Sequence, residues 1–124
     1  MDAEEAIKGI MVHRKAIHAG KQWSDPLGLS ETMLKLATYN AYLADNIAGL
    51  HHDATESHQS AYKSARELEN TQGDAEMLAK YESLDKRTSH ERVKYVYEST
   101  KNLISVLQTR LKAIQNAMQQ EGGI

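Results

Sequence analysis

The chain has 124 residues, a hydrophobic content of 40%, a formal net charge of −2 and no cysteine. This length supports one modest hydrophobic core, so we expect a single helical domain over residues 1–124. The missing cysteines exclude disulfides, a thiol nucleophile and cysteine-ligated metal centres. Because its start is acidic and no apolar run approaches about 18 residues, the sequence predicts neither a signal peptide nor a membrane span, and we expect a cytoplasmic protein with no membrane contact.

The residue types favour helices. There is one proline and one tryptophan, and phenylalanine is absent. A core made of Leu, Ile, Ala, Met and Tyr suits seams between helices better than a thick globular interior. We therefore predict an all-α fold: a long antiparallel helical hairpin, coiled-coil-like, with a shorter N-terminal helix packing on its open end.

The first helix is expected from about residue 2 to 19. One stripe of this helix needs a neighbouring helix to cover it. The stripe consists of Ala3, Ala6, Ile7, Ile10, Arg14 and Ile17. Gly20 then ends the helix, because a glycine adopts the left-handed conformation of a helix terminator without strain.

Residues 20–29 are expected to form a loop. Ser30 is the expected N-cap of the following helix, although Asp25 capping a turn that begins at Pro26 is an alternative. The loop carries the single tryptophan, Trp23. A tryptophan in this position is expected to close the open end of a bundle, and it is also a candidate anchor for a partner protein.

The second helix is expected over residues 30–70, and its two halves differ. The first half repeats large apolar residues and the second half repeats small ones. These positions are Met33, Leu36, Leu43, Ile47 and Leu50, followed by Ala54, Ser57, Ala61, Ser64 and Leu68. Asn40 falls in the same seam, where a polar group fixes the register at some cost in stability. Gly49 lies inside the helix, so we expect a close contact or a slight bend there.

Residues 71–74 are expected to form the hairpin turn, with Gly73 in the left-handed conformation and Asp74 capping a third helix over residues 74–120. A stutter near Ser89 is expected, with a break as the alternative. From there on, apolar side chains recur at alternating spacings of four and three, the heptad pattern of a seam between helices. The seam consists of Val93, Tyr97, Thr100, Ile104, Leu107, Leu111, Ile114 and Met118.

A hairpin that folds about Gly73 pairs residues whose numbers sum to roughly 144–146. Its register would place the large apolar residues of the second helix beside the heptad seam of the third. It would also place His90 opposite Thr55. More apolar residues are present than one seam consumes, so we also expect a homo-oligomer, a dimer or higher.

Charge is distributed unevenly along the chain. Residues 1–85 carry 8 Lys or Arg against 14 Asp or Glu, whereas residues 86–124 carry 7 against 3. The favoured interpretation is an acidic helix that pairs with a basic one, within the fold or across a dimer. The alternative is a nucleic-acid-binding stripe on the last helix. Its candidate residues are Lys86, Arg87, Arg92, Lys94 and Lys101.

Four histidines are candidates for a protein-binding surface together with Trp23. They are His51, His52, His58 and His90. A solvated polar patch, sensitive to pH, is favoured over a metal site because the Glu-x-x-His pairs of di-iron bundles and the His-Glu-x-x-His motif are missing. We therefore predict no bound metal; if one binds, His52, Glu56 and His90 are its candidate ligands. No cofactor is expected.

The sequence also lacks a Gly-x-Ser-x-Gly elbow, a phosphate-binding Gly-x-x-x-x-Gly-Lys loop and a dinucleotide fingerprint. These are the motifs that would indicate hydrolysis, nucleotide hydrolysis or redox chemistry. We therefore expect a protein that is not an enzyme.

Three segments resemble small helical-hairpin proteins that phages and prophages encode near their recombination and single-strand-binding genes. These segments are Ala-Tyr-Lys-Ser-Ala-Arg at 61–66, Gly-Asp-Ala-Glu at 73–76, and Leu-Ile-Ser-Val-Leu-Gln-Thr-Arg-Leu-Lys at 103–112, in which Thr109 replaces the Ser of the family pattern. The resemblance covers about residues 30–118. It implies a phage accessory protein in the host cytoplasm, acting through protein contacts in DNA metabolism or against a host nuclease or defence factor, and it transfers no catalytic residue.

Three functional hypotheses follow. The first is a noncatalytic helical adaptor or inhibitor that binds another protein. The second is a nucleic-acid-binding accessory protein that uses the basic stripe. The third is a His/Glu metal site on a helical bundle.

Overall fold

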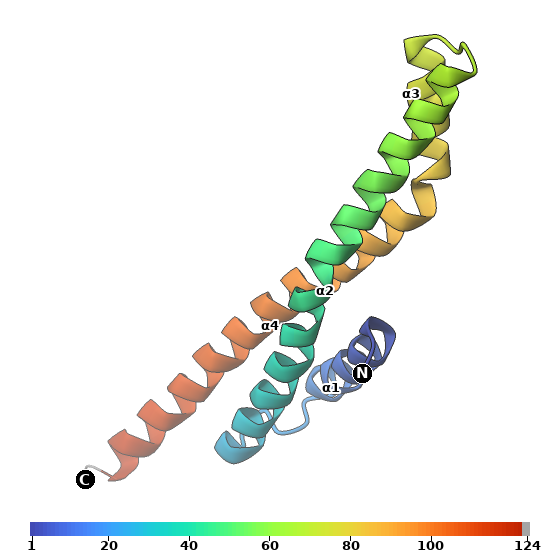
Figure 1. The fold of residues 1–124 in the computed structure, drawn as a ribbon. Helices are drawn as coiled ribbons and strands as arrows, with labels where there is room; N and C mark the ends of the chain where they lie inside the picture. Colours follow the sequence, from blue (N-terminus) through green and yellow to red (C-terminus); the bar gives the residue numbers. More distant parts are fainter. Residues whose placement is uncertain (123–124) are drawn as a thin grey trace. The chain divides into compact units, whose positions relative to one another are not determined.

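The computed structural model describes residues 1–122. Within them the chain forms four α-helices and no strand. The helices are α1 (Ala3–His18), α2 (Pro26–Glu67), α3 (Gln72–Glu82) and α4 (Leu84–Gly122) (Figure 1). The predicted all-α fold class is confirmed. None of these helices is both long enough and apolar enough to cross a membrane.

The helices contribute to two compact units. Unit 1 consists of Met1–Leu43 and Val96–Ile124, and unit 2 consists of Ala44–Tyr95. Unit 1 therefore contains α1, the start of α2 and most of α4, whereas unit 2 contains the rest of α2, all of α3 and the start of α4. The expectation of a single domain stays a prediction.

Unit 1 is a three-helix arrangement with a core of aliphatic side chains. Its fully buried positions on α2 and α4 repeat at intervals of seven residues, as expected for a helix that keeps one face toward its neighbours. Burying each large aliphatic side chain stabilises the fold by about 1.5–3 kcal/mol. The buried residues are Ala6, Ile7 and Ile10 of α1, Leu29, Thr32, Leu36, Asn40 and Leu43 of α2, and Val96, Thr100 and Leu107 of α4. The predicted packing of a shorter N-terminal helix on the long helices is confirmed.

Polar contacts align the three helices of unit 1. Arg14 donates a hydrogen bond to Ser99 Oγ at 2.8 Å, which joins α1 to α4. Asn40 Nδ2 donates to the Tyr97 carbonyl at 3.2 Å, which joins α2 to α4. Asn40 is almost fully buried, and its Oδ1 atom has no hydrogen-bond partner among the described residues. This is the expected behaviour of a seam asparagine, which costs stability and fixes the register.

The connection between α1 and α2 is shorter than predicted. Gly20 has a φ of 78°, and the N–H groups of Gly20 and Lys21 donate to the carbonyls of Ile17 and Ala16, so the predicted glycine terminator is confirmed. However, α2 begins at Pro26 and not at Ser30. The predicted start at Ser30 was therefore wrong, and Pro26 suits the first position of the helix because the proline ring presets φ there.

The turn between α2 and α3 differs from the prediction. Helix α2 ends at Glu67, and the residue in the left-handed conformation is Glu69 (φ 65°), whereas Gly73 lies inside α3. The N-cap of α3 is Thr71, whose hydroxyl accepts from the Asp74 N–H at 3.2 Å. The predictions of a left-handed Gly73 and of an Asp74 cap were therefore wrong. Because the chain reverses before residue 72, the predicted fold-back about Gly73 was wrong as well.

The predicted third helix is interrupted at Ser83, between α3 and α4, and not near Ser89. Residue 89 lies inside α4, where the helix is continuous. The apolar pattern alone did not locate the break. Few apolar residues occur in this part of the sequence, so a change in their spacing marks a region and not a single residue.

Unit 2 has a core of small side chains. Its buried residues are Ala54, Ala65, Ala75, Ala79, Ser83 and Val93. Small side chains allow the backbones of neighbouring helices to approach closely but bury little apolar area, as expected from the second half of α2. Gly49 makes no such approach, because a Cβ placed there would meet nothing within 4 Å. The expected close contact at Gly49 is therefore absent.

The left-handed conformation of Glu69 gives a first prediction. Replacing this exposed residue by glycine should raise the free energy of unfolding by about 0.5–1 kcal/mol, because glycine adopts a positive φ without steric strain. Urea unfolding followed by circular dichroism measures the change. The matched control is Lys63→Gly inside α2, which should lower the free energy of unfolding by about 1 kcal/mol. Loss of stability in Glu69→Gly would contradict the assigned turn.

His13 gives a second prediction. Burial lowers the pKa of His13 below its ordinary value of 6.5, and the nearby Lys35 ammonium lowers the pKa further. The folded chain therefore favours the neutral imidazole. This contribution to stability is complete above pH 6.5, the value in the unfolded chain, and is lost as the pH falls toward the lower value of the folded chain.

The free energy of unfolding of the natural chain should therefore decrease between about pH 7 and pH 5, and His13→Gln should decrease less. Urea titrations at several pH values measure the difference. The control is His18→Gln, at an exposed position of the same helix. If both variants keep the pH dependence of the natural chain, His13 is not the group responsible.

Candidate functional site

One groove in unit 2 gathers three imidazoles and two basic side chains around a cavity of about 450 Å³. We call it the imidazole groove. The residues with titratable or charged side chains that line it are His51, His58, Arg87, His90, Glu91 and Lys94. The first two lie on α2 and the others lie on α4.

The helical repeat places these side chains on facing surfaces. His51 and His58 are seven residues apart, so they lie on the same face of α2, two turns from each other. Arg87, His90 and Lys94 follow one another at spacings of three and four residues, so they share one face of α4. Each wall of the groove is therefore one helix face.

The imidazoles of the groove have partners of different kinds. The ring centroids of His51 and His90 are 5.1 Å apart, across the groove from one another. His58 Nε2 lies 3.7 Å from Glu76 Oε2 of α3, so that protonation of His58 would make this contact an ion pair. Lys94 is exposed and makes no hydrogen bond or ion pair with any residue in the range 1–122. The groove thus holds a cation that is free to meet a ligand.

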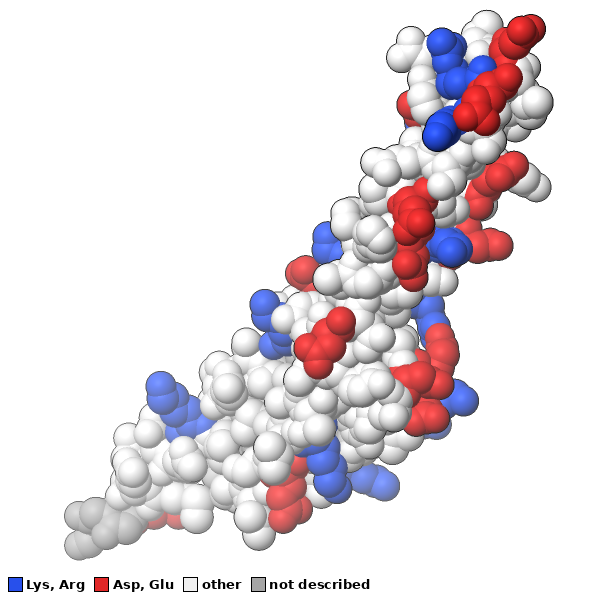
Figure 2. Space-filling view, in the orientation of Figure 1, with Lys and Arg blue, Asp and Glu red and all other residues white. Residues whose placement is uncertain are grey.

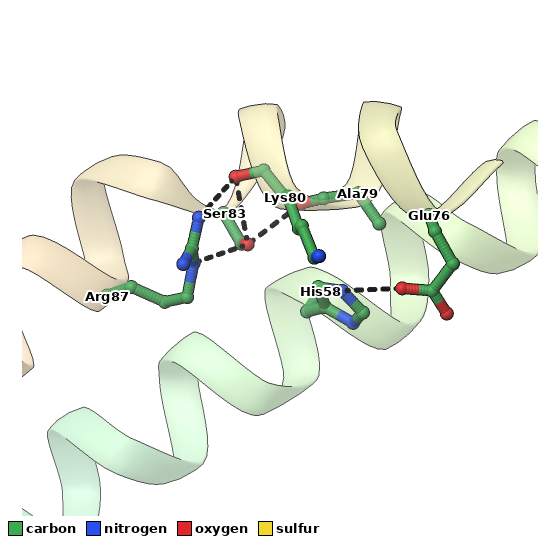
Figure 3. A network of polar contacts seen from close by, with 6 residues as sticks. All are labelled: His58, Glu76, Ala79, Lys80, Ser83 and Arg87. Carbon is green, nitrogen blue, oxygen red and sulfur yellow. Dashed lines mark hydrogen bonds and ion pairs between the residues drawn. The ribbon is translucent and has the colours of Figure 1, made fainter. Parts of the chain in front are cut away.

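Arg87, one of the residues that line the groove, contacts the break between α3 and α4 (Figure 3). Ser83 is fully buried, and its hydroxyl donates to the Ala79 carbonyl at 2.8 Å. Arg87 reaches back across the break: its Nη2 donates to the Lys80 carbonyl at 2.8 Å and its Nε donates to Ser83 Oγ at 3.3 Å. A helix end leaves carbonyls without partners inside the helix, and here the guanidinium satisfies one of them.

Two sets of predicted residues therefore meet in one groove. His51, His58 and His90 were candidates for protein binding, whereas Arg87 and Lys94 were candidates for nucleic-acid binding. The sequence does not indicate the contact between Glu76 and His58, because this contact depends on the position of the turn and of the helix break. Glu91 was also missed, although its place beside His90 in the sequence was a signal.

His52 does not join the groove. Its imidazole Nε2 lies 3.2 Å from Glu56 Oε2 one turn along α2, and both side chains are largely exposed. His90 instead faces His51, so the structure does not bring His52, Glu56 and His90 together as a ligand set. No group of three or more His, Asp or Glu side chains placed to hold a metal ion occurs in the part of the chain that the structure describes.

The candidate nucleic-acid-binding residues have different surroundings. Arg87 is engaged at the helix break, and the Lys101 ammonium lies 5.6 Å from the centre of the Tyr97 ring in unit 1. Lys86 and Arg92 are exposed on α4 but do not line the groove. Figure 2 shows Lys and Arg interspersed with Asp and Glu on the face in view. Interspersed charge of both signs is typical of a solvated surface and not of a phosphate-backbone track.

A second groove lies in unit 1 beside Trp23, with a cavity of about 460 Å³. We call it the tryptophan groove; it is lined by Trp23, Ser105, Val106, Thr109, Arg110 and Ala113. Arg110 Nε donates to the Trp23 carbonyl at 2.9 Å, and the Arg110 guanidinium lies 5.2 Å from the centre of the indole ring. Trp23 nevertheless keeps 38% of its surface exposed, and the adjacent Val106 keeps 53%. The sequence indicated only Trp23 as a candidate. The other lining residues form a groove with it only because the loop that carries Trp23 lies against α4.

The chain has no significant match to a protein-family model, to a curated protein or to a solved structure. The resemblance to phage-encoded helical hairpins therefore stays a prediction.

The helix break gives a third prediction. Arg87→Met should lower the free energy of unfolding by about 1–2 kcal/mol, because it removes two hydrogen bonds from a charged donor and leaves the Lys80 carbonyl without this partner. Lys86→Met is the matched control, and it should change the free energy of unfolding by less than about 0.5 kcal/mol. Equal effects of the two substitutions in urea unfolding would show that Arg87 does not hold the break.

Proposed function

We propose that the chain is a noncatalytic helical adaptor or inhibitor that binds another protein through the tryptophan groove. The observation that carries this proposal is the partly exposed side chain of Trp23. Arg110 donates a hydrogen bond to the Trp23 backbone carbonyl, and its guanidinium lies over the indole ring. A tryptophan that is exposed and already ordered loses little conformational freedom on binding. Such residues are typical anchors of protein interfaces.

The shape and chemistry of the groove favour an amphipathic helix as its occupant. Trp23, Val106 and Ala113 provide an apolar floor, which suits a large aliphatic side chain of the partner. Arg110 supplies a positive charge at the same groove. We therefore propose that the partner helix presents an aliphatic residue with an acidic residue about one turn away, so that the carboxylate lies near the Arg110 guanidinium.

Nucleic-acid binding is less well supported. The candidate residues are divided between the helix break, an aromatic contact in unit 1 and the imidazole groove. Residues 1–85 carry a clear excess of acidic side chains, which opposes binding along a phosphate backbone. Self-association is a further possible use of the tryptophan groove, and the following experiment distinguishes a second copy from a different protein.

A photoreactive amino acid placed at Val106 should form a discrete crosslinked product in the native host. The added mass identifies the occupant: a second copy doubles the mass of the chain, whereas a partner protein gives another value. In the Trp23→Ala background the yield of this product should fall at least about tenfold, because losing an interface anchor costs about 2 kcal/mol or more.

Met11 and Leu27 provide the controls for this experiment. Met11 is an exposed residue of α1 outside the groove, so the photoreactive residue placed there should not give the same product. Leu27→Ala removes another exposed apolar side chain and should leave the yield from Val106 unchanged. A product that forms equally from both positions, or that survives Trp23→Ala, would contradict the proposal. A product with twice the mass of the chain would identify the occupant of the groove as a second copy of the chain and not as a different protein.

A further inference from the structure

We propose that the imidazole groove is a binding site for a dianionic oxyanion, either inorganic phosphate or a phosphomonoester, and that binding is coupled to proton uptake by His51 and His90. This site is separate from the tryptophan groove and does not depend on the function proposed for it. Its basis is the pair of facing imidazoles together with the cations that surround them.

The facing imidazoles explain the coupling. With ring centroids 5.1 Å apart, His51 and His90 cannot both be protonated without two like charges lying close together. An oxyanion that accepts an N–H hydrogen bond from each ring removes this repulsion, because each imidazolium then has a negative partner. Binding the anion therefore favours protonation, and protonation favours binding the anion by the same factor.

The charges around the pair have the sign that an anion needs. From α4, Arg87 and Lys94 oppose the single carboxylate of Glu91, so the lining carries one more positive than negative charge while the imidazoles are neutral. From α2, His58 adds a further positive charge on protonation, and from α3 the Glu76 carboxylate is 3.7 Å from that ring. Lys94 has no partner among the described residues, so its ammonium can turn to a ligand without breaking a contact.

The size of the groove fits a small ligand. A cavity of about 450 Å³ lies within the range of about 300–1,000 Å³ that is typical of small-molecule sites. A phosphate group alone would fill only part of it. The remaining surface includes Ala54, Thr55 and Gln59, which could contact the organic part of a phosphomonoester.

The test follows the imidazole resonances of the full chain by nuclear magnetic resonance during pH titrations with and without sulfate. Sulfate is the first probe because it stays dianionic between about pH 5.5 and pH 8, so any pH dependence comes from the protein. Sulfate should move the titration midpoints of His51 and His90 to higher pH. The midpoint of His52, which lies on the same helix but outside the groove, should not move.

Affinity gives the second measurement. The affinity for sulfate should rise by up to about tenfold for each unit fall in pH for each proton taken up. His51→Asn and His90→Asn should each reduce this pH dependence by the proton that the replaced ring takes up, and the double variant should remove most of it, whereas His52→Asn should keep it. Circular dichroism verifies that the variants remain folded. His58→Asn keeps the facing pair and should bind with a reduced affinity but with the coupling intact.

Two further probes distinguish the source of the oxyanion. If ribose 5-phosphate binds more tightly than inorganic phosphate, the ligand is a phosphomonoester. If it binds equally or more weakly, the ligand is the free anion. An oligothymidylate tests nucleic acid, because each of its phosphodiesters carries a single charge. Three results would overturn the proposal. They are tighter binding of the oligothymidylate without proton uptake, a shift of the His52 titration midpoint equal to those of His51 and His90, and an affinity for sulfate that does not change with pH.

Discussion

The seven-residue repeat of α4 is the constraint on which both units depend. Val93 is buried in unit 2, and Thr100 and Leu107, at intervals of seven residues, are buried in unit 1. A straight helix keeps residues at this spacing on nearly the same face. Within each unit α4 buries residues at this spacing, and other positions of α4 line the groove of that unit.

The difference between the units follows from the size of their buried side chains. In unit 1, Leu36, Leu43 and Leu107 supply most of the apolar area that stabilises a helix seam. In unit 2, Ala54, Ala65 and Ala79 allow close approach but leave little apolar surface to shield. Polar side chains can therefore line the space between its helices without a large penalty, and the imidazole groove is formed in this way.

The break at Ser83 links the local backbone to that groove. Arg87 satisfies the Lys80 carbonyl and contacts the Ser83 hydroxyl, and the same residue lines the groove. Its guanidinium therefore contributes positive charge to the site while stabilising the helix end that places it there. Glu76, on the other side of the break, reaches His58 and links α3 to α2.

The sequence by itself determined the helical class, the seams and the chemistry available to the chain. The heptad spacing from Val93 onward and the change from Leu43 to Ala54 along α2 are local patterns, and local patterns survive into the fold because side-chain periodicity decides which helix face is buried. Tertiary structure alone decided the register, the break at Ser83 and the membership of the grooves. The chain reverses at Glu69 and not at Gly73, and His90 lies with its ring 5.1 Å from that of His51, in a groove that the predicted neighbour Thr55 also lines. No local pattern contains that information, because the choice of turn depends on how well the whole length of two helices packs and not on which residue most readily adopts a positive φ.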